Sequence, residues 1–318
     1  MNNKDLIPNN DSENSSDIVP TISPTKAAIL GLIVVFIVFQ LGGGILAVAI
    51  FGFDINNANM NLLRLLTIGT QILFILFPAI LFSKLVYEDV TTIIRLKMPK
   101  MKEVGLLSIG MIVLIPLLQE YLNIQNYIIV KLAESNMFIK GIKDFLDTLD
   151  KYVEQSYNQI LTGNNILEMI LIVITVAITP AICEELFFRG FVQKSFEFKL
   201  KPFFAIFLTA LFFGIYHFNP YGLLPLIVIG MYLGFAVYLT DSIIVSMALH
   251  FLNNFISIMA FFIYGDDELM QSNFVDIERI DTHIISFILL LALFIGFVIF
   301  VKRNYYKITN NEVQNDLS

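Results

Sequence analysis

Long apolar runs alternate with short polar segments from about residue 27 to residue 302. A helix that crosses a bilayer needs ~20 predominantly apolar residues. Runs of about this length lie at 27–53, 62–86, 105–122, 165–194, 202–218, 222–240, 242–264 and 283–302. The pattern therefore predicts an all-α polytopic membrane bundle of about eight transmembrane helices, which forms a single membrane domain over residues 27–302.

Three of these runs carry residues that modify a simple helix. The third run is short and contains Pro116 and Glu120. The fourth run is long, and its Pro180 should kink the helix just before a pair of glutamates, because proline removes a backbone hydrogen bond. In the sixth run, Gly230 and Gly234 have the spacing that permits close packing of membrane helices, although glycine is also simply common in such helices.

The segment at about 123–164 differs from its neighbours, because charged residues recur in it at helical spacing among Ile, Phe and Leu. This pattern predicts one or two amphipathic helices at the membrane interface, acting either as a cover over a cavity or as a plain connector. Residues 1–26 are rich in Asn, Ser, Asp and Pro, which predicts a disordered tail. Residues 303–318 are interpreted as a second tail.

The basic residues between the runs predict how the bundle is oriented. With eight spans, three basic groups fall on one side together with both termini: Arg95, Lys97, Lys100 and Lys102; Lys194, Lys199 and Lys201; Lys302, Arg303 and Lys307. Loops rich in Lys and Arg stay on the cytoplasmic side. The opposite loop at 265–282 is acidic, with Asp266, Asp267, Glu268, Asp276, Glu278 and Asp281. We therefore expect both termini to be cytoplasmic.

The composition agrees with a membrane protein and excludes other classes. The chain is 57% hydrophobic and 15% charged, and its mean hydropathy is +0.76. A net charge of -7 argues against nucleic acid as a partner, and a single cysteine excludes an internal disulfide framework or a cysteine metal cluster. The high content of Asn, Ile and Lys is typical of low-GC bacterial proteins, so we expect a bacterial plasma membrane.

The stretch 183–190 places three ionisable side chains within an apolar run. A charge at bilayer depth costs at least ~2.5–3.5 kcal/mol, so such groups are functional candidates. Glu185 and Arg189 are four residues apart and share a helix face, whereas Glu184 is rotated by about 100° from Glu185. This spacing predicts that Arg189 neutralises Glu185 and that Glu184 faces a wet cavity. The neighbouring Cys183 is interpreted as a packing residue rather than a nucleophile.

Two of the three histidines also lie within apolar runs, each four residues from a second functional candidate. Phe213 precedes His217 by four residues, and His250 precedes Asn254 by four. A buried carboxyl group such as Glu184 can act as a general base towards water, with His217 holding that water or relaying its proton. His250 and Asn254 can then donate hydrogen bonds to a developing oxyanion, each contributing on the order of 3 kcal/mol. Amide-bond hydrolysis requires this set of groups.

The ordered set Glu184-Glu185-x-x-x-Arg189, Phe213-x-x-x-His217 and His250-x-x-x-Asn254 resembles the three-motif signature of the CPBP family. That family comprises type II CAAX prenyl endopeptidases and the bacterial Abi group, which is linked to bacteriocin immunity and peptide processing. The resemblance covers a core of about 165–264. It implies an eight-helix intramembrane endopeptidase with a cavity open to the cytosol and a membrane-associated or lipidated peptide as substrate. It also implies catalytic roles for Glu184, His217, His250 and Asn254, and a structural pair of Glu185 and Arg189.

The residues leave other functions open. Glu184, His217 and His250 could instead bind zinc and leave one position for a catalytic water. However, the chain has no His-Glu-x-x-His helix, and we favour a site without a cofactor. A bacteriocin-immunity or scaffold protein could use the same groups structurally. A transporter could use them as a proton path, but the chain shows no convincing internal repeat.

Overall fold

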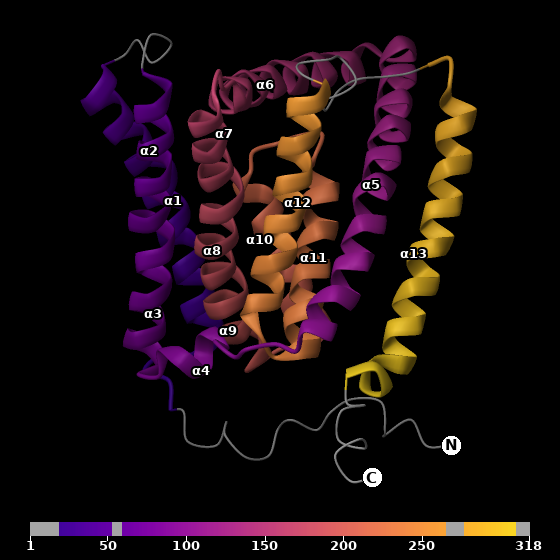
Figure 1. Cartoon of the computed structure of the whole chain (residues 1–318). Coiled ribbons are helices and arrows are strands. Elements are labelled where there is room, and N and C mark those ends of the chain that lie inside the picture. The colour runs from indigo at the N-terminus through magenta and orange to yellow at the C-terminus, as the bar shows by residue number, and fades with distance from the viewer. Residues whose placement is uncertain (1–18, 53–58, 265–276, 310–318) are drawn as a thin grey trace.

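The computed structural model describes residues 19–52, 59–264 and 277–309, and all regular elements within these ranges are helical (Figure 1). Each of the eight apolar runs forms a helical rod. Seven rods are long and apolar enough to cross a membrane, and the shorter Pro202–Tyr216 is the eighth. The prediction of an all-α polytopic membrane bundle is confirmed. The predicted tail at 1–26 lies largely outside the described residues, as does most of the acidic loop at 265–282.

The rods do not lie in the order of the chain, because the third rod, Met101–Ser135, packs against the last one, Ile280–Thr309, at one edge of the bundle (Figure 1). Six of the rods are single helices and two are composite. The elements are α1 (Pro24–Phe51); α2 (Met60–Gln71), η2 (Ile72–Leu76) and α3 (Phe77–Tyr87); α4 (Val90–Ile94); α5 (Met101–Ser135); α6 (Met137–Leu161); α7 (Ile166–Val173), η3 (Ile174–Ile178), α8 (Thr179–Glu185), η4 (Leu186–Gln193) and α9 (Lys194–Glu197); α10 (Pro202–Tyr216); α11 (Leu223–Thr240); α12 (Ile243–Tyr264); and α13 (Ile280–Thr309).

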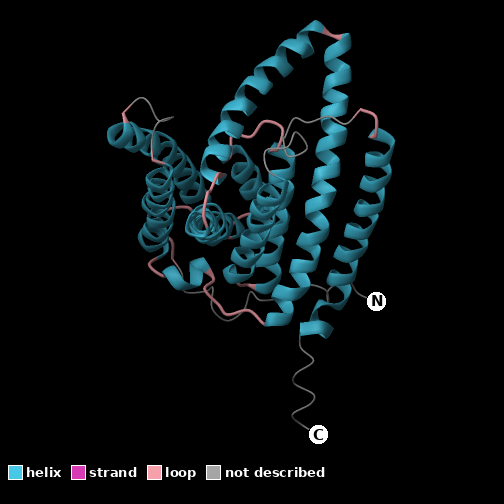
Figure 2. Cartoon of the chain, turned by 45° about the horizontal axis from the view of Figure 1, so that its top comes forward, coloured by secondary structure: helices cyan, strands magenta, loops and turns pink. Residues whose placement is uncertain are grey.

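The third rod and the segment after it differ from the prediction in their boundaries. α5 continues as one helix through Pro116 to Ser135, so residues 123–135 extend a membrane span rather than begin an interfacial helix. Asn136 separates the two elements, and its side chain accepts hydrogen bonds from the backbone N–H groups of Phe138 and Ile139. This is the usual role of asparagine at a helix N-terminus. α6 then crosses one end of the bundle, as both views show (Figures 1 and 2).

Two hydrophobic clusters hold the bundle together. The first is centred on the fully buried phenylalanines of η4, which pack against α1, α3 and α10. The second joins α5, α11 and α12, with α13 against its outer side. Gly230 and Gly234 of α11 contribute close approaches. A Cβ atom on Gly230 would lie 3.1 Å from Ala210 Cα, and one on Gly234 would lie 2.6 Å from Gln193 Oε1. The two glycines therefore serve helix packing.

The two ends of the bundle carry different charges. We call the end that holds α4 and the start of α10 the basic end, because the described residues there include Arg95, Lys97, Lys199 and Lys201. The C-terminal turns of α13 reach the same end (Figure 1). α6 lies at the opposite end, which we call the α6 end. All three predicted basic groups therefore lie on one side, although which compartment that side faces remains a prediction.

Candidate active site

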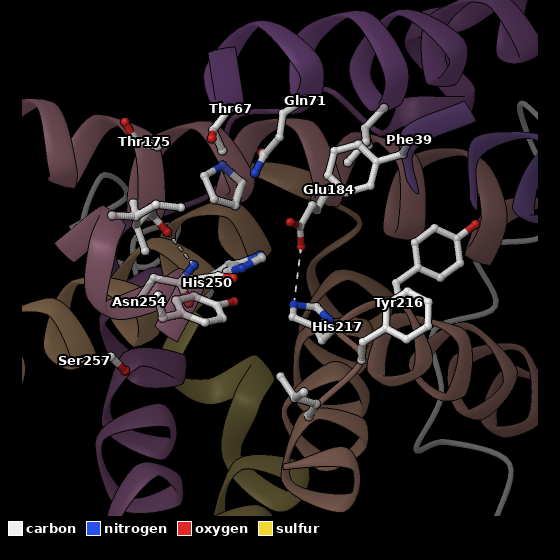
Figure 3. Close-up of a pocket in the computed structure, with 18 of the residues that line it drawn as sticks. Phe39, Thr67, Gln71, Thr175, Glu184, Tyr216, His217, His250, Asn254 and Ser257 are labelled. Carbon is white, nitrogen blue, oxygen red and sulfur yellow. Dashed lines mark hydrogen bonds and ion pairs between the residues drawn. The ribbon is translucent and has the colours of Figure 1, made fainter. Parts of the chain in front are cut away.

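A cavity with a volume of about 580 Å³ lies between α2, α6, α8, α10 and α12. Glu184, His217, His250 and Asn254 all contribute to its wall. Their side chains point towards one shared space (Figure 3). The structure thus brings together the four residues that sequence spacing selected, from three separate rods.

Glu184 and His217 face each other across this cavity. Glu184 Oε2 lies 4.0 Å from His217 Nε2, and the two side chains are 14% and 21% exposed. This separation is too long for a direct hydrogen bond, but groups at such a distance are commonly bridged by a water molecule. His217 Nδ1 lies 2.7 Å from the carbonyl oxygen of Phe213. Because a carbonyl only accepts, Nδ1 carries the proton, and Nε2 of the neutral ring offers its lone pair to the space beside Glu184.

Glu185 points away from the cavity into a fully buried ion pair. Arg189 Nη1 donates to Glu185 Oε1 at 2.6 Å, and both side chains are 0% exposed. Arg189 Nη2 also donates to the carbonyl oxygen of Gly230 at 3.1 Å. The pairing inferred from the spacing of four is therefore present in the structure. It ties the helix that bears Glu184 to α11.

The same carboxylate also positions His250, which the spacing did not reveal. His250 Nδ1 lies 2.8 Å from Glu185 Oε1, and His250 is 3% exposed. A carboxylate accepts hydrogen bonds, so Nδ1 carries the proton, and Nε2 is the ring nitrogen left to act elsewhere. Glu185 and His250 are 65 residues apart in the sequence, so helical periodicity could not predict their contact. Only the packing of α12 against α8 brings them together.

Pro180 explains how Asn254 is positioned. Proline lacks the N–H that would bond the carbonyl four residues earlier, which here is that of Val176. Asn254 Nδ2 donates to this carbonyl at 2.9 Å. The surrounding backbone adopts π-helical turns in η3, a form of helix that is frequent at functional sites. The sequence predicts a kink near Pro180, and the structure has a π-helical turn just before this residue. One of the two amide N–H groups of Asn254 stays available.

Phe213 packs among the charged and imidazole groups. Its ring centroid lies 4.6 Å from that of His217 and 5.8 Å from that of His250, and the Arg189 guanidinium sits 4.4 Å from the same ring. A cation over an aromatic face is attracted by the ring quadrupole. The Phe213 ring therefore packs against the imidazole rings of both His217 and His250.

Several cavity residues were not selected from the sequence. α2 contributes Thr67 and Gln71, four residues apart on one face, and α6 contributes Ser156 and Tyr157. The spacing of Thr67 and Gln71 was visible in the second apolar run. The amphipathic segment is predicted to act either as a cover over a cavity or as a connector, but its pattern does not show which of its residues line the cavity.

The donor set does not favour a metal. Among the residues that the structure describes, no three His, Cys, Asp or Glu side chains are grouped closely enough to hold an ion. Glu184, His217 and His250, the alternative zinc ligands, do not form such a group among these residues, and a site without a cofactor stays a prediction. Cys183 is buried, at 1% exposure, within the η4 cluster.

The fold and this cavity define a class of protein: an integral membrane bundle with polar, hydrolysis-competent groups held between its helices. Residues 166–256 match the family model described as Type II CAAX prenyl endopeptidase Rce1-like. The chain matches none of the curated proteins and none of the solved structures with which it was compared. The matched segment contains all three motifs. This match confirms the resemblance of that segment to the CPBP intramembrane proteases.

Proposed function

We propose that this protein is an endopeptidase that hydrolyses a peptide bond of a membrane-associated or lipidated peptide, with no cofactor. Glu184 and His217 activate the water, and His250 and Asn254 stabilise the oxyanion. The observation that carries this proposal is the 4.0 Å gap between Glu184 Oε2 and His217 Nε2 on the wall of one cavity. The protein acts in a bacterial plasma membrane, with both termini in the cytoplasm.

The reaction uses groups whose positions are known. A water molecule in the gap donates one hydrogen bond to the Glu184 carboxylate and one to His217 Nε2. Glu184 takes a proton from this water as its oxygen attacks the carbonyl carbon of the substrate. The carbonyl π electrons move to its oxygen, which becomes the oxyanion of a tetrahedral intermediate. When this intermediate collapses, the C–N bond breaks and the proton held by Glu184 passes to the leaving amine.

The oxyanion accepts hydrogen bonds from the free amide N–H of Asn254 and from His250. With Nδ1–H of His250 donating to Glu185, protonation of Nε2 gives an imidazolium whose charge the carboxylate balances. Both donors are fixed before substrate arrives, His250 by Glu185 and Asn254 by the Val176 carbonyl. Donors preorganised in this way contribute on the order of 3 kcal/mol each.

The test is cleavage of a quenched fluorogenic peptide library by the purified, reconstituted protein. We expect Glu184→Gln to lose cleavage by at least ~10²-fold, because general-base catalysis contributes about that much. The matched control is Glu120→Gln. Glu120 Oε2 lies 2.5 Å from His283 Nδ1, which makes a further Glu–His pair whose two residues do not line the cavity. Glu120→Gln should retain cleavage.

Two results would contradict the proposal. If Glu184→Gln, folded and inserted normally, kept the native rate, Glu184 would not be the base. If the native protein cleaved no peptide while Glu184→Gln retained full biological activity in cells, a non-catalytic immunity or scaffold function would be favoured instead.

A further inference from the structure

The cavity is closed towards the basic end. Below Glu184, the helix face that continues towards that end carries Glu185, Arg189 and Gln193, all 0% exposed. Gln193 Nε2 donates to the carbonyl oxygen of Gly234 at 3.1 Å and to Glu197 Oε1 at 2.9 Å. Buried phenylalanines of η4 fill the neighbouring space. Among the described residues, these buried side chains fill the space between the cavity and the basic end, so we expect no passage for a peptide on this side.

The cavity extends in the other direction, towards α6. Ser156, Tyr157, Ile160 and Leu161 of this amphipathic helix line it, so its wall reaches from the middle of the bundle to the α6 end. α10 ends at Tyr216, close to the cavity, and does not cover this side.

α6 is fastened on both sides of the cavity. Arg64 of α2, itself 1% exposed, donates through Nε to the carbonyl oxygen of Ile160 at 3.0 Å. On the other side, the Tyr221 hydroxyl, in the segment that follows His217, donates to Asp147 Oδ1 at 2.5 Å. These bonds anchor α6 across the region where the cavity approaches the membrane surface.

The charge asymmetry of the bundle assigns the two ends to compartments. Arg95, Lys97, Lys199 and Lys201 lie at the basic end, and loops of this composition remain in the cytoplasm. The described residues Asp144, Asp147, Asp150 and Glu154 all lie on α6, although Lys140, Lys143 and Lys151 accompany them. The α6 end therefore faces away from the cytoplasm.

We propose that the substrate reaches the site from the extracytoplasmic side, beneath α6, and is an uncharged extended segment of an exported or outer-leaflet peptide. This inference rests on the proposed function. Among the residues that the structure describes, Glu184 is the only acidic residue of the cavity wall, and no Lys or Arg contributes to it. Neutral groups such as Thr67, Gln71 and Ser257 provide hydrogen bonds for a peptide backbone. The direction of access is opposite to the cytosolic opening that the family resemblance implies.

The test labels introduced cysteines in sealed vesicles with a membrane-impermeant maleimide. The native Cys183 is buried, so we expect it to contribute little maleimide labelling of its own. Ser257→Cys reports on the cavity, Thr148→Cys on the exposed surface of α6, and Lys199→Cys on the basic end. We expect Ser257→Cys and Thr148→Cys to react in right-side-out vesicles, and Lys199→Cys only in inverted vesicles.

Three results would overturn this inference. These are reaction of Ser257→Cys only in inverted vesicles, its failure to react in either orientation, and reaction of Lys199→Cys from outside. A second assay separates this inference from the proposed function. An impermeant fluorogenic peptide that the solubilised protein cleaves should be cut by right-side-out vesicles. Cleavage by inverted vesicles alone would refute the access route and leave the endopeptidase function intact. No cleavage in any preparation would count against the function itself.

A separate observation concerns Gln71 of α2. Gln71 lines the cavity and is 7% exposed, and its buried Oε1 atom has no hydrogen-bond partner. Burying an amide oxygen without a partner costs about 1–3 kcal/mol, so such atoms require an explanation. Figure 3 shows Gln71 beside Glu184, with its amide directed into the same space. We infer that Gln71 Oε1 accepts a backbone N–H of the bound peptide next to the scissile bond.

N-methylation of a peptide substrate tests this role. Methylation of one backbone nitrogen near the scissile bond should raise KM by about tenfold, as expected for loss of a hydrogen bond of ~1.4 kcal/mol. In Gln71→Leu, KM should rise similarly for the unmethylated peptide, and methylation at that position should have no further effect. Gln71→Glu retains an acceptor and should recover the sensitivity to methylation. Equal methylation penalties in the native and Gln71→Leu proteins at every position would refute the assignment.

Discussion

Replacing Arg189 with methionine would remove one member of the buried ion pair and retain most of the side-chain volume. In the native protein, Arg189 and Glu185 are both 0% exposed and their closest atoms are 2.6 Å apart. The substitution leaves the Glu185 carboxylate buried at that depth, with His250 and Ser246 of α12 as its remaining polar neighbours. We expect a large loss of stability.

The size of this loss follows from the desolvation of the remaining charge. Removing one partner of a buried ion pair typically costs about 3–5 kcal/mol. Replacing both charges is much less costly, because neither ion then has to be desolvated. The double variant Glu185→Gln with Arg189→Met should therefore recover most of the stability. The glutamine also keeps an acceptor oxygen for His250 Nδ1.

Thermal unfolding in detergent, followed by the loss of helical circular dichroism, measures the order of stabilities. The matched control is Lys131→Met, which removes an ion pair of 2.9 Å whose side chains are 45% and 56% exposed. Pairs at such exposure contribute roughly 0–1 kcal/mol, so this variant should unfold close to the native temperature. The variants should rank as native, Lys131→Met, the double variant and finally Arg189→Met.

Either of two results would refute this reasoning. Arg189→Met could prove as stable as Lys131→Met, which would mean that the pair is hydrated in the membrane protein. Alternatively, the double variant could unfold with Arg189→Met, which would mean that the loss comes from packing around the guanidinium and Phe213 rather than from charge.

Three further predictions concern packing, catalysis and metal dependence. Gly234→Ala places a methyl group 2.6 Å from Gln193 Oε1 and should destabilise the bundle by about 1–3 kcal/mol, whereas Gly296→Ala meets nothing within 4 Å and should be neutral or stabilising in the same unfolding assay. Asn254→Ala should lower kcat by about 10²–10³-fold with KM little changed, and an unchanged kcat would exclude it as an oxyanion donor. Dialysis against a chelator, followed by the cleavage assay, should leave the rate unaltered; loss of activity that zinc restores would contradict the metal-free proposal.

Much of the architecture could be predicted from hydrophobic runs, because a bilayer imposes one length on every span. All eight runs are helices, and the predicted ends fall within a few residues of the observed ends for most of them. The main difference is α5, whose helix continues to Ser135 because Pro116 does not interrupt it. Apolar content marks where a helix lies within the membrane, but a helix can continue beyond it.

The site was predictable where its contacts are local. Glu185 and Arg189 are four residues apart on one helix, so periodicity alone brings them together. The bond between His250 and Glu185 and the bond between Asn254 and Val176 join different rods. Sequence spacing carries no information about such contacts. Gln71 was missed for the same reason, since an amide in an apolar run acquires meaning only when its neighbours are known.

The length of α10 has a consequence for how water is supplied to the reaction. Its 15 residues span ~22 Å, which is less than the ~30 Å of a bilayer hydrocarbon core. Lipid around a short span thins locally, and headgroups and solvent move inwards. Water can therefore reach His217 from the thinned bilayer surface, and hydrolysis needs no dedicated water channel through the protein. Turnover should then fall in vesicles made from longer-chain lipids and rise in thinner ones.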